Sequence, residues 1–371
     1  MAELLLTNDF DDEDPYLLPN ADALAVLSST REVVEQGEYV WIDIDRVKLL
    51  AHQWIQPGGE YRGASTTLPI WYEQYHFHEG TERTVNWILA LDAMNFCFWA
   101  EKDQARWSIE YQGETLNGYL AEAAALRRAV EENIPLWDAA YLSTISHEEL
   151  AHIFRGEQSI PLLEQRLHNV REVGRVLLER YNGQFINAIE QAERNTVKLV
   201  LLLAQDFPSF NDVVLYRNHL VRFFKRAQIC IADLHGSFGG KSWGAFSDFD
   251  QLTAFADYKL PQVLRHFGVL EYHPSLAERI DSQQLLETGS EEEVEIRAAT
   301  IWACELLRRE MIRQDHPVIA AEIDLRLWLL GQNSSDMRPY HRTRTIYYYR
   351  VSLNKGTWQN VLLWGVLRHK S

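Results

Sequence analysis

Cysteine is scarce in this chain of 371 residues. The three that occur, Cys97, Cys230 and Cys304, are far apart, and no two of them form a CxxC pair. A disulfide framework and a cysteine-ligated zinc site both need cysteines at short, paired spacings. We therefore expect neither of these, and we expect the reducing environment of the cytoplasm.

Basic charge and long apolar runs are also in short supply. Lysine and arginine total 36 against 53 acidic residues, a formal net charge of −17. Proteins that follow the phosphates of long nucleic acids carry a basic face, so we expect no stable nucleic-acid complex. A small phosphorylated ligand needs only a local basic cluster. The longest aliphatic run, LVLLLA at 199–204, is far shorter than the roughly 20 residues of a membrane span, and we expect no membrane partner.

Apolar and aromatic residues are abundant, at 46% and 12% of the chain, and they recur at helical spacing through most of it. VNWILALDAMNFCFWAE at 85–101 is apolar nearly all round, which predicts a buried helix. RWSIEYQGETLNGY at 106–119 alternates around a Gln-Gly turn and predicts a small β-hairpin. The sequence therefore predicts a mainly α fold, a single globular helical domain with a minor β element.

The ends of the chain differ from its middle. Residues 1–26 are acidic and contain proline and asparagine, which predicts a loosely ordered N-terminal arm. We expect the helical domain over 27–348 and a C-terminal extension, without an assigned role, over 349–371. Nothing in the sequence predicts an oligomeric state.

Two short motifs resemble known sites but have the wrong spacing. GSFGGKS at 236–242 ends like a phosphate-binding loop, yet the first glycine of that motif falls on His235 and the preceding segment is predicted to be helical. HEELAH at 147–152 places its histidines about 140° apart around a helix, so they do not share a metal ion. Ser146 as an N-cap explains that stretch better. We expect a helix-ending hinge at 236–242 and no metal site.

The strongest functional signals lie between residues 210 and 268. LVRFFKRAQICIADL at 220–234 predicts a helix that carries three basic residues, Arg222, Lys225 and Arg226, away from its apolar stripe. Such a cluster is either a solvated, salt-bridged face or an anion site. The predicted stripe consists of Leu220, Phe224, Ala227, Ile231 and Leu234.

Two groups of polar residues have aromatic neighbours. Asp257 precedes a predicted helix whose first turn contains Pro261, and Phe255 and Tyr258 flank it, so it is either a simple cap or a group in a pocket. On the predicted helix 85–101, aspartate and asparagine share one arc with aromatic residues. This is either a core helix with satisfied polar groups or a slot that reads a planar base. The residues of that arc are Asp92, Asn95, Phe96 and Trp99.

Taken together, these segments resemble the queuosine salvage protein family, and the resemblance extends from about Ser28 to Tyr348. The matching stretches are VNWILALDAMNFCFWAE, FPSFNDV, FFKRAQICIADL, LTAFADYKLPQVLRHFG, EVEIRAATIWACELL and YHRTRTIYY. The family is described as queuosine 5′-phosphate N-glycosylase, which hydrolyses the N-glycosidic bond of the nucleotide and releases the 7-deazaguanine base queuine for reuse in tRNA. The resemblance implies a fold similar to the helix-hairpin-helix DNA glycosylases and implies no cofactor.

The resemblance also implies catalytic roles. Many members of the wider superfamily have a helix that begins with lysine, then a loop, then a catalytic aspartate that opens the next helix. Lys225 and Asp257 match these positions, whereas Asp233 lies inside the preceding helix and is the next candidate. The loop between the two is longer here than in the DNA glycosylases. We expect Asp257 to stabilise the oxocarbenium-like state and to activate water.

A 7-deaza base has carbon in place of N7, so hydrogen bonds to its pyrimidine edge must assist its departure. We assign that edge to Asp92 and Asn95, and the ring face to Phe96, Trp99 and Tyr258. The alternatives are a glycosylase for another nucleotide or for tRNA, and a non-catalytic nucleobase-binding protein. The predicted ligands of the 5′-phosphate and ribose are Lys225, Arg226 and Lys259.

Overall fold

The computed structural model describes residues 14–19, 21–56, 73–332 and 336–346. Within these ranges there are fourteen α-helices, and strands occur only as three antiparallel pairs, which confirms the mainly α prediction. None of the helices described is long and apolar enough to cross a membrane. Most of the predicted N-terminal arm and all of the predicted C-terminal extension lie outside the described residues, so both stay predictions.

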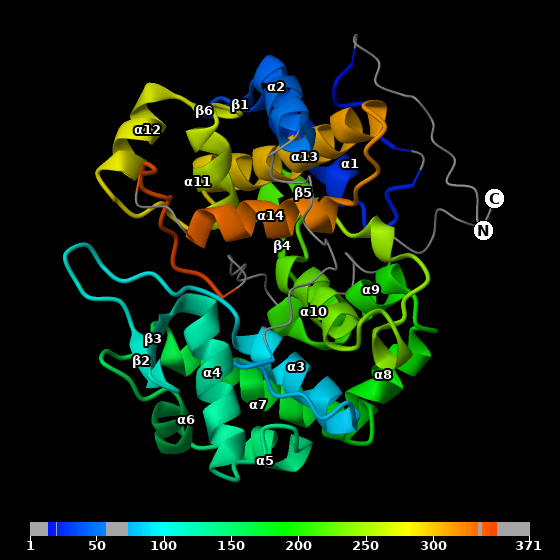
Figure 1. The fold of residues 1–371 in the computed structure, drawn as a ribbon, viewed down its shortest axis with the longest axis vertical. Helices are drawn as coiled ribbons and strands as arrows, with labels where there is room; N and C mark the ends of the chain where they lie inside the picture. The colour runs from blue at the N-terminus through cyan, green and yellow to red at the C-terminus, as the bar shows by residue number, and fades with distance from the viewer. Residues whose placement is uncertain (1–13, 20, 57–72, 333–335, 347–371) are drawn as a thin grey trace.

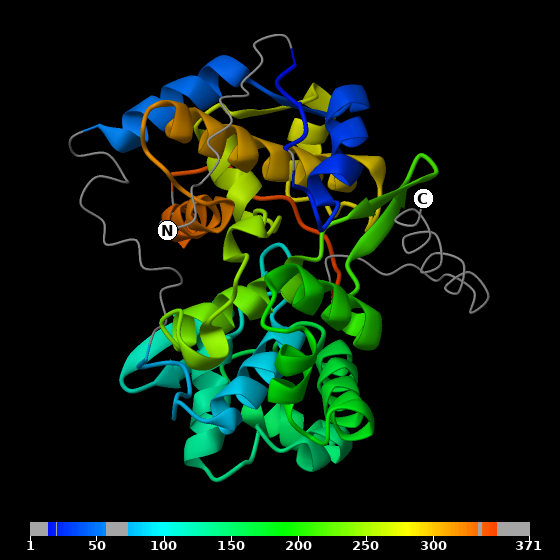
Figure 2. The same ribbon diagram turned by 90° about the vertical axis from the view of Figure 1, so that its right-hand side faces the viewer.

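The helices form two groups, one above the other in the views of Figures 1 and 2. The lower group contains the central part of the chain, in cyan to green. Its helices are α3 (Glu82–Met94), α4 (Gly118–Glu131), α5 (Ala139–Thr144), α6 (His147–Ile153), α7 (Leu163–Arg180), α8 (Phe185–Gln191), α9 (Thr196–Asp206) and α10 (Lys225–Ser237).

The upper group brings together the two ends of the described chain, drawn in blue and in yellow to orange in Figure 1. Its central helix, α13, contacts α1, α2, α11 and α14. The helices of this group are α1 (Val26–Gln36), α2 (Ile44–Ile55), α11 (Lys259–His266), α12 (Pro274–Asp281), α13 (Glu291–Arg313) and α14 (Ala320–Gln332).

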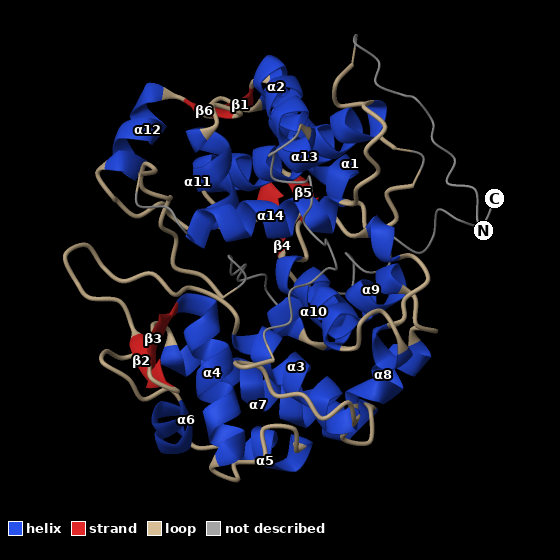
Figure 3. Ribbon diagram, in the orientation of Figure 1, coloured by secondary structure: helices blue, strands red, loops and turns tan. Residues whose placement is uncertain are grey.

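Strands are few and short, as the secondary-structure colours of Figure 3 show. The predicted hairpin over 106–119 is confirmed: β2 (Ser108–Tyr111) pairs with β3 (Glu114–Asn117) around the Gln-Gly turn. A second hairpin, β4 (Val213–Tyr216) with β5 (His219–Arg222), precedes α10 and contacts α1 and α13. The third pair joins segments far apart in the chain, β1 (Val40–Ile42) and β6 (Leu270–Tyr272).

Buried apolar side chains form two main clusters, one for each group of helices. The larger is centred on α3, α4, α7 and α10 and also takes in part of α1 and α13. The smaller lies between α2, α11, α13 and α14. Because α13 contributes to both clusters, the two groups share one continuous packed body.

Caps at helix ends agree with the sequence. Ser146 and Glu149 form a capping box at the start of α6, which explains the HEELAH stretch without a metal. At the end of α10, Gly239 donates its backbone N–H to the carbonyl of Gly236, and Gly240 donates to that of His235. Both glycines have positive φ, so the end of α10 is a Schellman motif. The GSFGGKS stretch is therefore a helix stop, as predicted.

The helix predicted over 85–101 is shorter in the structure. It is α3, which ends at Met94, and residues 95–99 continue in an irregular conformation. Two buried arginines explain this end, because Arg226 donates to the carbonyls at positions 92 and 93 and Arg166 to those at 94, 96 and 97. The prediction of one helical arc is therefore wrong: Asp92 is on α3, and Asn95, Phe96 and Trp99 lie beyond it.

The helix predicted over 220–234 begins later than expected. Residues 219–222 form β5, and the helix, α10, begins at Lys225. Phe224, just before it, has a left-handed backbone with φ of 49°. Leu220 and Arg222 are therefore on the strand, and of the predicted stripe only Ala227, Ile231 and Leu234 lie on α10, where all three are buried. The carboxylate of Asp212 stops the helix from extending backwards, because it accepts the backbone N–H of Lys225 and is itself held by Arg297.

Candidate active site

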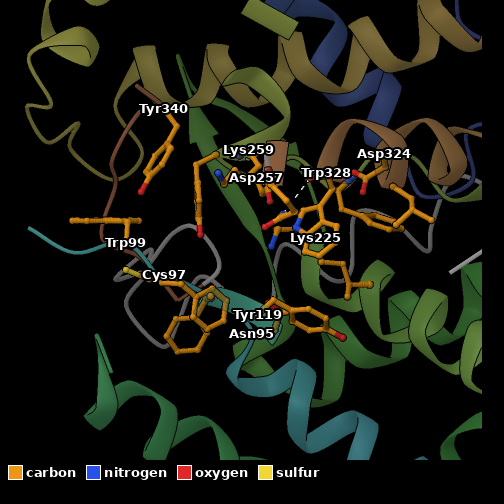
Figure 4. A pocket seen from close by; sticks show the side chains of 18 of the residues that line it. Asn95, Cys97, Trp99, Tyr119, Lys225, Asp257, Lys259, Asp324, Trp328 and Tyr340 are labelled. Atoms are coloured by element: carbon orange, nitrogen blue, oxygen red, sulfur yellow. Dashed lines mark hydrogen bonds between the residues drawn. The ribbon is translucent and has the colours of Figure 1, made fainter. Parts of the chain in front are cut away.

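A cavity of about 300 Å³ lies where the two groups of helices meet, a size that suits a small molecule. Its lower wall comes from residues 95–99, the start of α4 and one face of α10. Its upper wall comes from the start of α11 and one face of α14 (Figure 4). Most of the large side chains that line it are aromatic. They are Phe96, Phe98, Trp99, Tyr119, Phe249, Phe255, Tyr258, Trp328 and Tyr340.

Asp257 lies in this cavity at the start of α11. Its Oδ1 accepts the backbone N–H of Lys259 at 2.6 Å and that of Leu260 at 3.0 Å. These two N–H groups have no carbonyl partner within the helix, so the carboxylate both caps α11 and is held in one orientation. The sequence left open whether Asp257 is a helix cap or a group in a pocket. In the structure it is both.

Lys225 and Asp324 lie beside Asp257, as Figure 4 shows. Burial lowers the pKa of Lys225, an effect that the charges of Asp257 and Asp324 partly oppose. Burial, and then the charge of Asp257, raise the pKa of Asp324 well above its usual range. Asp324 also accepts the N–H of Phe255 at 2.6 Å, which ties α14 to the segment that carries Asp257.

Tyr340 lies among polar and aromatic side chains on another side of the cavity. The ring of Tyr258 lies 4.9 Å from that of Tyr340, and the Lys259 ammonium lies 5.3 Å from the Tyr340 ring centre. Arg106 donates to the Tyr340 hydroxyl at 3.2 Å. Lys259 also donates to the carbonyl of Gly331 at 2.8 Å. The cations on this side of the cavity can bind an anionic group of a ligand.

The lower wall of the cavity has a carboxylate of its own. Asp233, two turns after Lys225 on α10, lines the cavity and accepts a hydrogen bond from the Tyr119 hydroxyl at 3.0 Å. Behind it lies Asp92, which is fully buried and has Asn95 and Cys230 as neighbours. Burial, and then the charge of Asp233, raise the pKa of Asp92 well above its usual range.

The structure brings most of the predicted site residues together. Asp257 and Lys225 share the cavity, the two positions that the family resemblance singled out. Asp92 and Arg226 do not line it, because Asp92 is behind α10 and the guanidinium of Arg226 is used to hold the end of α3. The other predicted residues that line the cavity are Asn95, Phe96, Trp99, Tyr258 and Lys259.

Sequence reasoning missed several residues of the site. Asp324 and Trp328 come from α14, a helix that was not predicted. Tyr119, the last residue of the predicted hairpin segment, is on α4 in the structure. Asp233 was considered only as a substitute for Asp257. Tyr340 lies in YHRTRTIYY, a stretch that carried the family resemblance but no assigned role. No group of three or more metal-ligating side chains occurs among residues that the structure describes.

The fold and the cavity together define a mainly α-helical protein with a small-molecule site, equipped with carboxylates and a lysine for acid–base chemistry. The family model for the queuosine salvage protein matches residues 75–348. The chain therefore belongs to the queuosine salvage protein family.

Similar proteins extend over most of the chain. A protein of Sphaerobacter thermophilus is 49% identical over 328 residues, which cover 88% of this chain and 98% of the relative. One of Mus musculus is 33% identical over 339 residues, which cover 88% of this chain and 99% of the relative. A third, from Schizosaccharomyces pombe, is 32% identical over 303 residues, covering 75% and 87%. All three bear the name queuosine 5′-phosphate N-glycosylase/hydrolase.

Proposed function

We propose that this protein hydrolyses the N-glycosidic bond of queuosine 5′-monophosphate and releases queuine and ribose 5-phosphate. The observation that carries the proposal is the placement of Asp257 in an aromatic-walled cavity, fixed by two backbone N–H groups at the start of α11. The names of the similar proteins support the same substrate. Three buried free cysteines and the acidic net charge suit a cytoplasmic enzyme that acts on a nucleotide rather than on a long nucleic acid.

Asp257 is the proposed catalytic carboxylate. Breaking the C1′–N bond builds positive charge on the ribose, and a fixed carboxylate beside C1′ stabilises that charge. The same group takes a proton from the attacking water. Its two helix-end hydrogen bonds keep it oriented, so little reorganisation is needed when the charge develops.

The remaining cavity residues provide the binding site. Aromatic side chains such as Phe96, Trp99 and Tyr258 suit the flat base, and Asn95 provides hydrogen bonds. Lys225 and Lys259 bind the ribose and phosphate end. We add Arg106 to these proposed cations in place of Arg226, because Arg106 lines the cavity and Arg226 does not.

Replacing Asp257 by Asn tests the proposal. We expect wild-type protein incubated with queuosine 5′-monophosphate to release queuine, detected by mass spectrometry. Asp257→Asn should lower kcat by about 10²–10⁴-fold, the usual contribution of general-base catalysis, while substrate binding is retained. Full activity of Asp257→Asn would rule out the assignment. Release of queuine from tRNA instead of the nucleotide would favour the alternative substrate.

A further inference from the structure

Asp257 and its neighbour Asp324 line the upper wall of the cavity, and a third carboxylate, Asp233, lines the opposite wall. Hydrolysis through Asp257 gives Asp233 no role. Lys225, Ile229, Ala232 and Asp233 line the cavity from one face of α10. Lys225 and Asp233 are eight positions apart on the helix, a rise of about 12 Å. Asp257 and the cations Lys225 and Lys259 belong to one end of that face, and Asp233 belongs to the other.

The Asp233 end of the cavity carries no lysine or arginine among its lining residues; its polar groups there are Asn95, Tyr119 and Asp233. A nucleotide phosphate needs the cations of the other end. With C1′ beside Asp257 and the phosphate near Lys225 and Lys259, the base therefore extends toward Asp233. This step rests on the proposed function.

The surroundings of Asp233 keep a proton close to the cavity. Asp92 lies behind Asp233, and two neighbouring buried carboxylates do not both ionise readily. Burial raises the pKa of Asp233 to about 7, and the hydrogen bond from Tyr119 lowers it in part. His76 lies 2.9 Å from the Tyr119 hydroxyl through its Nε2. The other titratable groups near the pair are Glu122 on α4 and Cys230 and Arg226 on α10.

We propose that Asp233 is the general acid of the reaction, which donates a proton to the departing base, and that Tyr119 is the residue that positions it. As the oxygen of water bonds to C1′, the water loses a proton to Asp257, and the electron pair of the C1′–N bond passes to the base. The proton of Asp233 passes to the ring system over which that charge is delocalised. The products are neutral base and ribose 5-phosphate, and exchange with solvent restores both carboxyl groups. Such a donor matters because a 7-deaza base has no N7 to protonate.

A substrate whose leaving group needs no proton separates this role from a structural one. The probe is 4-nitrophenyl β-ribofuranoside 5-phosphate, compared with queuosine 5′-monophosphate. Asp233→Asn should lower kcat/KM for the nucleotide by about 10²–10⁴-fold and leave the rate on the nitrophenyl probe within about threefold. Asp257→Asn should lower both. Equal losses on both substrates in Asp233→Asn, or no loss on the nucleotide, would overturn the proposal.

The pH profile provides a second readout that does not depend on the nitrophenyl probe. The acid must be protonated, so kcat/KM of the wild type should fall as the pH rises through about 7. Asp233→Asn should lack this basic limb. Tyr119→Phe should move it to higher pH, because the hydrogen bond from Tyr119 lowers the pKa of Asp233. A basic limb unchanged in Asp233→Asn contradicts the proposal.

The base of queuosine also carries an amine, and a counter-ion for that amine is the competing role of Asp233. An ionised counter-ion predicts activity that rises with pH through about 7, the opposite sign. It also predicts that Asp233→Asn keeps its activity on 7-deazaguanosine 5′-monophosphate, which lacks the amine, whereas the general acid predicts a loss of activity on that substrate too.

Asp206 provides a matched control, because its carboxylate accepts a hydrogen bond from the Tyr181 hydroxyl away from the cavity. Asp206→Asn should leave the pH profile unchanged. If wild-type protein cleaves no substrate, it is the proposed function that fails.

Discussion

At the scale of single residues, similar side chains have different tasks. Lys225 and Arg226 are neighbours in sequence, yet Lys225 faces the cavity and Arg226 points into the protein. The reason is that α10 turns about 100° per residue, and the carbonyls at the end of α3 need donors. A basic cluster read from sequence thus contains one ligand candidate and one structural residue.

Replacing Arg226 and Lys259 should separate these two tasks. Arg226→Ala removes a donor from three buried carbonyls, of which that of Ala93 keeps the side chain of Asn169 as a second donor. It should lower the free energy of unfolding by about 2 kcal/mol or more. Lys259→Ala should instead raise KM for the nucleotide about tenfold or more through loss of a charge-assisted contact. Urea unfolding and steady-state kinetics measure the two effects. A large KM effect from Arg226→Ala in a fully stable protein would contradict this division.

At the scale of elements, the ends of helices build the site. Asp257 acts from the start of α11, Lys225 from the start of α10, and residues 95–99 follow the end of α3. A side chain at a helix end can form hydrogen bonds with the helix backbone while the rest of it stays open to the cavity. The Schellman motif at the end of α10 lets the chain turn back toward the segment that carries Asp257.

Two glycines of that motif should differ in their tolerance of a side chain. Both have positive φ, which costs a non-glycine residue about 1–2 kcal/mol. A Cβ at Gly240 would also lie 2.9 Å from the ring of His235, which stacks on Phe249, whereas a Cβ at Gly239 meets nothing within 4 Å. Gly240→Ala should therefore destabilise the protein more than Gly239→Ala in thermal unfolding. Equal costs would show that the His235 ring moves freely.

At the scale of the whole molecule, the cavity needs both groups of helices. Asp233 and Asn95 come from the lower group, and Asp257 and Asp324 from the upper group. A bound ligand therefore contacts both, and α13 already joins their cores. Binding should stabilise the molecule as one unit.

Ligand binding to Asp257→Asn tests this whole-molecule coupling, because that variant should bind substrate and turn it over only slowly. Substrate at 100 times its Kd should stabilise the folded state by about 2.7 kcal/mol. We expect a single unfolding transition that moves to higher temperature in calorimetry. Two transitions, of which only one shifts, would mean that the groups unfold separately.

Much of the fold followed from local sequence. The central helices, the hairpin at 106–119, the Ser146 cap and the glycine stop after α10 depend on contacts between residues close in the chain, and these predictions are confirmed. The likeness to helix-hairpin-helix DNA glycosylases stays a prediction. The two misplaced helix ends, at Met94 and before Lys225, depend on Arg166, Arg226 and Asp212, which reach them from distant segments.

The sequence by itself determined the family and the mainly α class, because these are carried by residue order and helix signals. Only the tertiary structure decided which polar groups meet a ligand. It placed Asp92 behind the wall, Asp233 in it, and brought Asp324 from α14 to the side of Asp257. The physical reason is that the side of a helix that faces a cavity is set by what packs on its other sides, and those partners lie far away in sequence.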